Sequence, residues 1–135
     1  MRMKKTIPAL PVQDITSAIG YYSEKLGFTA RHQEADFAIL VRDDVEIHIW
    51  KSGDESWRNR GGGLISLPIC SGAESFLAGT ASCRIEVQGI EQLYQEYREK
   101  GALHSPHTVV TEQPWGNREF EAVDNYGNLL TFFEE

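Results

Sequence analysis

The sequence predicts an α+β fold of two pseudo-symmetric βαβββ units that form a curved mixed sheet with an open cleft. A stretch of the chain occurs twice, as VQDITSAIGYYSEK at 12–25 and as VQGIEQLYQEYREK at 87–100. Both copies carry apolar residues at helical spacing, and a strand, a tight turn and a second strand follow each copy. The repeat therefore indicates a single domain over 1–135, with a first unit at 1–70 and a second unit at 81–135.

The repeated stretch predicts one helix in each unit. The first helix is expected to begin after Asp14, whose side chain suits an N-cap, and to stop at Gly27. The second is expected to stop at Gly101. The apolar faces of the two helices comprise Ile15, Ala18, Ile19 and Tyr22 in the first and Ile90, Leu93, Tyr94 and Tyr97 in the second.

The segments after the helices predict paired strands. Residues 36–50 (DFAILVRDDVEIHIW) contain a turn at 43–44, and residues 119–133 (EFEAVDNYGNLLTFF) contain a turn at 126–128. The Gly- and Ser-rich connection 51–80 reads as a loop with a short strand at 64–70. Because side chains alternate along a strand, one face of the strand after the first turn carries Glu46, His48 and Trp50.

Composition limits the classes of partner and compartment. The net charge of −7 disfavours nucleic acid, because phosphates are repelled. No apolar run approaches the roughly 20 residues that span a bilayer, so no membrane contact is expected, and the N-terminus has no signal-peptide pattern. The two cysteines, Cys70 and Cys83, lack CxxC spacing. We therefore expect a cytoplasmic protein with reduced thiols.

This two-unit architecture resembles that of the vicinal-oxygen-chelate superfamily, and the resemblance implies that a metal enzyme would carry one metal ligand on the first strand and one on the last strand of each unit. Alignment of the two copies places these positions at Ile7, His48, Ser82 and Thr131. Only His48 has the side chain of a good metal ligand, and one imidazole does not make a site. The pair His104 and His107 lies in a loop that contains a proline, so no helix aligns it. We therefore expect no metal cofactor and no catalytic residues.

The stretch EQPWGNREF at 112–120 carries the resemblance to a family. Together with AVDNYGN, DFAILVRDDVEIHIW and the N-terminal IPALPVQDI, it resembles the pattern of bleomycin-resistance proteins, within the vicinal-oxygen-chelate (VOC) superfamily of glyoxalases, bleomycin-resistance proteins and dioxygenases. The resemblance spans both units. It implies a homodimer that sequesters a bleomycin-type drug without modifying it, which is a form of antibiotic resistance. It also implies that the protein needs no cofactor, although the bound drug can carry its own copper.

The resemblance indicates which residues contact the drug. A planar bithiazole is bound by stacking on an aromatic ring. Trp115, between Pro114 and Gly116, is the best candidate for that ring in the sequence. Phe37 matches a family aromatic, whereas His32 and Arg84 stand where relatives can have aromatic residues. The predicted ligand-binding residues are Trp115, Gly116, Phe37, His32, Glu46, His48, Trp50 and Arg84.

Several alternatives stay open at this stage. Trp115 either contacts a ligand or holds its own loop on the core, and Pro8 is either the hinge of an exchanged N-terminal strand or an ordinary strand start. Trp57 is either a lid or a cover for an apolar patch. The chain as a whole is a drug-binding protein, a metal-dependent lyase or dioxygenase of the same fold, or a binder of another aromatic or cationic small molecule.

Overall fold

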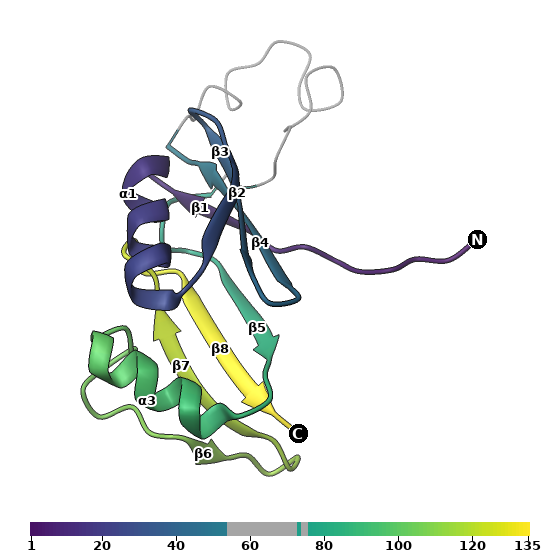
Figure 1. Cartoon of the computed structure of the whole chain (residues 1–135), viewed down its shortest axis with the longest axis vertical. Coiled ribbons are helices and arrows are strands. Elements are labelled where there is room, and N and C mark those ends of the chain that lie inside the picture. The colour runs from purple at the N-terminus through teal and green to yellow at the C-terminus, as the bar shows by residue number, and fades with distance from the viewer. Residues whose placement is uncertain (54–72, 74–75) are drawn as a thin grey trace.

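The computed structural model describes residues 1–53, 73 and 76–135. They form two four-stranded mixed sheets, each with one helical layer, in the predicted order of elements (Figure 1). The predicted α+β fold class is therefore confirmed. Trp57, Cys70 and the predicted strand at 64–70 lie outside the described residues.

The first unit contains β1 (Ala9–Val12), α1 (Ile15–Tyr21), η1 (Tyr22–Leu26), β2 (Thr29–Gln33), β3 (Phe37–Arg42) and β4 (Val45–Lys51). Its strands lie in the order β1-β4-β3-β2. β1 pairs with β4 in parallel, and the other pairs are antiparallel. The turn at 43–44 lies where the sequence predicts it, and Asp43 adopts a left-handed backbone with φ of 51°.

The second unit repeats this arrangement. It contains β5 (Ser82–Glu86), α3 (Ile90–Lys100), β6 (Thr111–Glu112), β7 (Arg118–Val123) and β8 (Leu129–Glu134). The strand order β5-β8-β7-β6 matches that of the first sheet, and β5 pairs with β8 in parallel. Each unit therefore has the four strands of the predicted βαβββ pattern, with β2 or β6 as the first strand after the helix.

The first helix differs from the single α-helix that its spacing predicts. Asp14 caps it as expected, accepting a hydrogen bond from the Ser17 backbone N–H at 2.8 Å. The α-helix ends at Tyr21, however, and a π-helical turn continues to Leu26 before Gly27, which has φ of 77°. Contacts with the second unit hold both ends of this turn. The Tyr22 hydroxyl donates to Asp124, and the Leu26 carbonyl accepts from Tyr97.

Both helices cover the same side of the two sheets (Figure 1). On that side the strands bury alternate apolar residues, among them Leu40, Ile47 and Ile49 in the first unit and Phe120, Leu130 and Phe132 in the second. Alternation then turns Glu46, His48 and Trp50 to the opposite face, as predicted. The sheet faces that the helices leave uncovered are thus the polar and aromatic ones.

A buried network joins the turn between β7 and β8 to the first unit. Asp124 and Asn128 are 3% and 0% exposed. The Asp124 carboxylate accepts hydrogen bonds from the Tyr22 hydroxyl at 3.0 Å and from the Asn128 side-chain amide at 2.8 Å. The same amide donates to the Pro11 carbonyl at 2.8 Å. The DNYGN turn therefore holds one unit against the other through the hydrogen bonds of Asp124 with Tyr22 and of Asn128 with Pro11.

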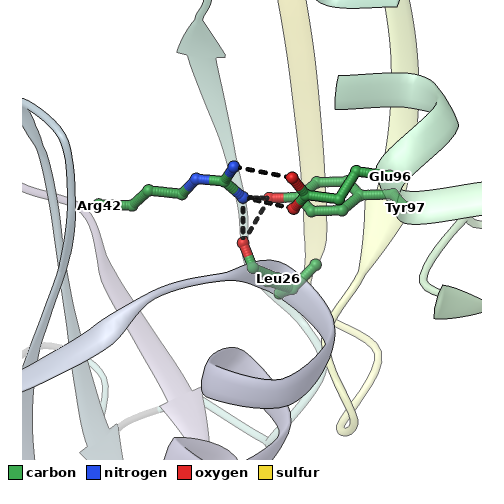
Figure 2. A network of polar contacts seen from close by, with 4 residues as sticks. All are labelled: Leu26, Arg42, Glu96 and Tyr97. Atoms are coloured by element: carbon green, nitrogen blue, oxygen red, sulfur yellow. Dashed lines mark hydrogen bonds and ion pairs between the residues drawn. The ribbon is translucent and has the colours of Figure 1, made fainter. Parts of the chain in front are cut away.

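A second network joins the units near the end of the first helix (Figure 2). The Arg42 guanidinium donates to both carboxylate oxygens of Glu96, at 2.7 and 3.0 Å, and to the Leu26 carbonyl at 2.8 Å. The hydrogen bond to Glu96 raises the pKa of Arg42 and lowers the pKa of Glu96. A bidentate pair of this kind sets orientation as well as distance.

Two further features concern the N-terminal segment and the length of the helices. Residues 1–8 form no helix or strand, and the N-terminus lies away from the body (Figure 1). Across the described ranges, no helix has the length and apolar character needed to cross a bilayer.

Candidate functional site

An aromatic cluster occupies the uncovered face of the first sheet. Phe37 is at its centre, with its ring centroid 4.3 Å from that of Trp50, 5.1 Å from that of His48 and 6.1 Å from that of His32. The register explains the cluster, because Phe37 lies directly opposite Trp50 on the neighbouring strand. The structure thus brings together four of the residues predicted to bind ligand. Phe37 belongs to this face rather than to the core under α1.

Glu46 lies two residues before His48 on the same face of β4 and contacts three basic side chains. Its carboxylate contacts His48 Nε2 at 2.7 Å, Lys5 Nζ at 3.1 Å and Arg31 Nη2 at 3.3 Å. The hydrogen bond with His48, followed by that from Lys5, lowers the pKa of the Glu46 carboxyl from 4.5 to about 2. Glu46 is therefore ionised at neutral pH and already paired within the chain.

Arg84 lies on the uncovered face of the second sheet. Its guanidinium carbon is 4.9 Å from the ring centroid of Phe133, and its Nη1 and Nη2 groups donate to the two carboxylate oxygens of Glu119. The Glu119 side chain is 6% exposed, whereas that of Arg84 is 49% exposed. The hydrogen bonds to Glu119 raise the pKa of Arg84. The arginine is thus held in one orientation with part of its surface open.

A cavity of about 520 Å³ connects the two faces. It is lined by residues 5–8 of the N-terminal segment, 44–47 at the start of β4 and 83–86 of β5. Glu46 and Arg84 therefore line the same hollow although they come from different units. Its volume lies in the range of small-molecule sites, roughly 300–1,000 Å³. The aromatic cluster continues from this hollow along β4.

A larger cavity of about 660 Å³ lies beside the pair formed by Arg42 and Glu96. Its lining includes Phe28, Tyr97 and Phe132, and it contains none of the predicted ligand-binding residues. It follows the boundary between the units on the side of the helices. Of the predicted ligand-binding residues, Glu46 and Arg84 line the smaller cavity and none lines the larger one.

Trp115 lies in the turn between β6 and β7 and is 65% exposed. The Gly116 backbone N–H donates to the Gln113 carbonyl at 2.9 Å, so Pro114 and Trp115 are the central residues of a tight turn. Gly116 follows with φ of 99°, a conformation that glycine adopts without strain. Figure 1 shows this turn near the opposite end of the molecule from the outer end of β3, where Phe37 begins the strand. One chain alone does not place Trp115 against the aromatic cluster.

The strand register changes the positions at which a metal would be expected. His48 lies opposite Ala9, and Thr131 lies opposite Arg84. The expected partners Ile7 and Ser82 are thus two residues too early, because pairing between strands far apart in the chain is not visible in either strand alone. The corrected set holds one imidazole, one hydroxyl, one methyl group and one guanidinium. These groups do not fit a divalent metal.

No group of three or more His, Cys, Asp or Glu side chains in the described part of the chain is arranged as metal ligands. The loop with His104 and His107 is held by its own contacts. The His104 N–H donates to the Glu121 carbonyl and the His107 N–H to the Ser105 hydroxyl. Burial, followed by the nearby Asp124, raises the pKa of Cys83 to about 11. Its thiol is therefore protonated at neutral pH and a poor nucleophile.

Sequence reasoning missed four residues that shape the site: Lys5, Arg31, Glu119 and Phe133. Period-two alternation places Glu119 and Phe133 on the uncovered face, because Phe120 and Phe132 beside them are buried. That signal was available in the sequence. Lys5 and Arg31 carried no such signal, since their contacts with Glu46 depend on how a terminal segment and an edge strand meet β4.

Comparison with known proteins identifies the family. A family model described as Glyoxalase/Bleomycin resistance protein/Dioxygenase superfamily matches residues 6–132. The chain belongs to this superfamily. It is 50% identical over 133 residues to a bleomycin resistance protein of Geobacillus stearothermophilus, and the alignment covers 98% of each chain. The same identity and coverage are found with a bleomycin resistance protein of Staphylococcus aureus.

Solved structures of the superfamily share the fold. A bleomycin resistance determinant encoded on the transposon Tn5 has a TM-score of 0.71 at 22% identity, covering 98% of both chains. A bleomycin-binding protein from Streptomyces verticillus, solved with copper(II)-bleomycin, has a TM-score of 0.71 at 24% identity, covering 98% of this chain and 96% of that one. These likenesses confirm the arrangement of two βαβββ units.

Proposed function

We propose that this chain binds bleomycin-family glycopeptides and thereby confers resistance to them. The observation that carries the proposal is the 50% identity to bleomycin resistance proteins over 98% of both chains. The aromatic cluster around Phe37 supports it, because flat rings on an open sheet face suit a planar heteroaromatic group. The adjoining cavity of about 520 Å³ offers room for further parts of such a ligand.

We further propose that the drug is sequestered and not chemically changed. In support, the four corrected metal positions lack a ligand set, and the Cys83 thiol has its pKa raised to about 11. The test is the mass of the drug after long incubation with stoichiometric protein. An unchanged mass supports sequestration, whereas a lost or added group refutes it. Stoichiometric Ni, Zn, Mn or Fe in the purified protein would instead favour a metal-dependent enzyme.

The site is proposed to form between two copies of the chain. Trp115 is 65% exposed, and the turn between β6 and β7 that carries it lies at the opposite end of the molecule from the start of β3 (Figure 1). A symmetric dimer brings a residue of one copy to the site of the other without moving either unit. The N-terminus lies away from the body (Figure 1), as that of a segment exchanged at Pro8 would. Light scattering is expected to give twice the chain mass, and a monomer that binds drug with full affinity would contradict this arrangement.

Calorimetry with metal-free and copper-bound bleomycin tests the function directly. We expect one drug molecule per chain and loss of affinity in Trp115→Ala. A dissociation constant above about 1 mM, which corresponds to a binding free energy of roughly −4 kcal/mol, would refute the proposal. Cytoplasmic expression in a sensitive bacterium is expected to raise the tolerated bleomycin concentration. If binding is absent, a screen of other aromatic and cationic compounds on the same protein identifies the alternative ligand class.

A further inference from the structure

The larger cavity, of about 660 Å³, lies between the two units and has no part in the proposed drug site. Its volume is also in the range of small-molecule sites, roughly 300–1,000 Å³. The first unit contributes Phe28 and the turn between β3 and β4, and the second contributes the end of β5, the first turns of α3 and Phe132. A ligand held here would therefore contact both units on the side of the helices.

Buried apolar side chains form the floor of this cavity, among them Phe28, Ile85, Tyr97 and Phe132. The rings of Tyr97 and Phe132 pack edge to face, with their centroids 5.3 Å apart. The Tyr97 hydroxyl donates to the Leu26 carbonyl at 2.8 Å, in the network drawn in Figure 2. The floor is thus ordered before a ligand arrives, which lowers the cost of binding.

Exposed carboxylates form the rim of the cavity: Asp43 and Asp44 in the turn between β3 and β4, and Glu86 at the end of β5. None of the three forms an ion pair with any residue that the structure describes. Arg42 is the single basic residue in the described lining, and its guanidinium donates to both carboxylate oxygens of Glu96. Because that pair is neutral overall, the rim carries uncompensated negative charge, which attracts a cation.

Two observations disfavour other kinds of ligand. The N-terminus of α3 borders the cavity, and a helix N-terminus can bind an anion. Here, however, the Glu134 carboxylate already accepts hydrogen bonds from the Gly89 and Ile90 backbone N–H groups, at 2.9 and 3.3 Å. A divalent metal is disfavoured because no three His, Cys, Asp or Glu side chains among the described residues are grouped as ligands.

We propose that the larger cavity is a second binding site, which takes an organic cation with an apolar body, such as an arylalkylammonium compound. The apolar body lies on the floor, and the ammonium group lies at the rim between the turn with Asp43 and Asp44 and the carboxylate of Glu86. The ligand therefore bridges the two units. This inference does not depend on bleomycin binding, because the larger cavity contains none of the residues predicted to contact the drug.

Titration of the full chain with phenylbutylamine, followed by NMR of the backbone amides, tests the proposal. Phenylbutyrate is the matched probe, since it has the same apolar body and the opposite charge. For a compound of this size we expect the amine to bind with a dissociation constant of about 0.1–1 mM. The largest shifts are expected at residues 43–45 and 85–93, which line the cavity. The carboxylate is expected to bind at least about tenfold more weakly, because the rim repels it.

Two variants locate the cation at the rim, and both change residues that line the larger cavity but not the smaller one. Gln92→Lys adds a positive charge and is expected to weaken amine binding about three- to fivefold. Gln95→Lys is its matched control, because Gln95 is exposed on the same helix outside both linings. Asp43→Asn is expected to weaken binding about two- to threefold. Asparagine suits this position, since φ is 51° and asparagine tolerates a left-handed backbone.

Four results would overturn the proposal. They are the absence of saturable shifts at ten times the weakest expected dissociation constant, equal binding of phenylbutyrate, shifts centred on the aromatic cluster around Phe37, and equal losses in Gln92→Lys and Gln95→Lys. The last result would mean that net charge, and not the rim, governs binding. Thermal unfolding identifies a variant that does not fold, and the comparison of the two probes on the wild-type protein then decides the matter.

Discussion

Replacement of Tyr22 by phenylalanine tests whether the buried network holds the two units together. Tyr22 is fully buried, and its hydroxyl donates to the Asp124 carboxylate at 3.0 Å. A hydrogen bond to a charged group contributes about 1.5–3 kcal/mol. Asp124 keeps three other donors, the backbone N–H groups of Tyr126 and Asn128 and the Asn128 amide. We therefore expect the lower end, a loss of about 1.5–2 kcal/mol in the free energy of unfolding.

Chemical denaturation and thermal unfolding measure this loss. For a chain of 135 residues, an unfolding entropy of about 2.1 cal/mol/K per residue converts it to a fall in Tm of roughly 5–7 °C. Tyr21→Phe is the control, because the adjacent hydroxyl donates to the neutral Val123 carbonyl at 3.1 Å and is only partly buried. The control is expected to lose about 0.5–1 kcal/mol.

Two results would refute this reasoning. Equal losses in Tyr22→Phe and Tyr21→Phe would mean that the charge and burial of Asp124 add nothing to the hydrogen bond. An unchanged Tyr22→Phe protein would mean that the turn between β7 and β8 does not depend on the first helix. In the second case the other hydrogen bonds between the units are enough to place them, among them those of Asn128 with Pro11, Tyr97 with Leu26 and Arg42 with Glu96.

Three further predictions follow from single residues. The hydrogen bond with His48 lowers the pKa of Glu46 from 4.5 to about 2, so the ionised Glu46 stabilises the fold fully above pH 4.5. This contribution to the free energy of unfolding is lost as the pH falls toward 2. Glu46→Gln is therefore expected to make the free energy of unfolding, measured in urea titrations at several pH values, fall less steeply at acid pH. Trp115→Ala is expected to leave Tm unchanged, since the side chain is 65% exposed, while drug affinity measured by calorimetry falls about fivefold or more. Gly79→Ala is expected to lower the free energy of unfolding, measured by chemical denaturation, by at least about 2 kcal/mol. The reason is that φ of Gly79 is 81° and that an added Cβ would lie 2.1 Å from the Tyr126 backbone oxygen, in the turn before β8. In the control Gly20→Ala, the added Cβ meets no atom within 4 Å, so the free energy of unfolding is expected to stay the same or rise.

The elements and the faces of this fold were predictable because their signals are local. The turns at 43–44 and between β7 and β8, the cap at Asp14 and the alternation along β4 all appear where the sequence places them. The π-helical turn at Tyr22–Leu26 was not predictable, since residues of the second unit hold its ends. The same limit explains the error at Ile7 and Ser82, which misplaced the strand register by two residues.

The sequence by itself determined the repeat, the alternation that turns Glu46, His48 and Trp50 away from the core, and the membership that the pattern around Trp115 indicates. Only the tertiary structure decided that Glu46 and Arg84 share a cavity, and that the Arg84 guanidinium lies over the Phe133 ring and pairs with the buried Glu119 carboxylate. The physical reason is the range of the interactions. Periodicity and turn propensity act within a few residues, whereas a parallel pair such as β5 and β8 sets its register through contacts between segments more than forty residues apart.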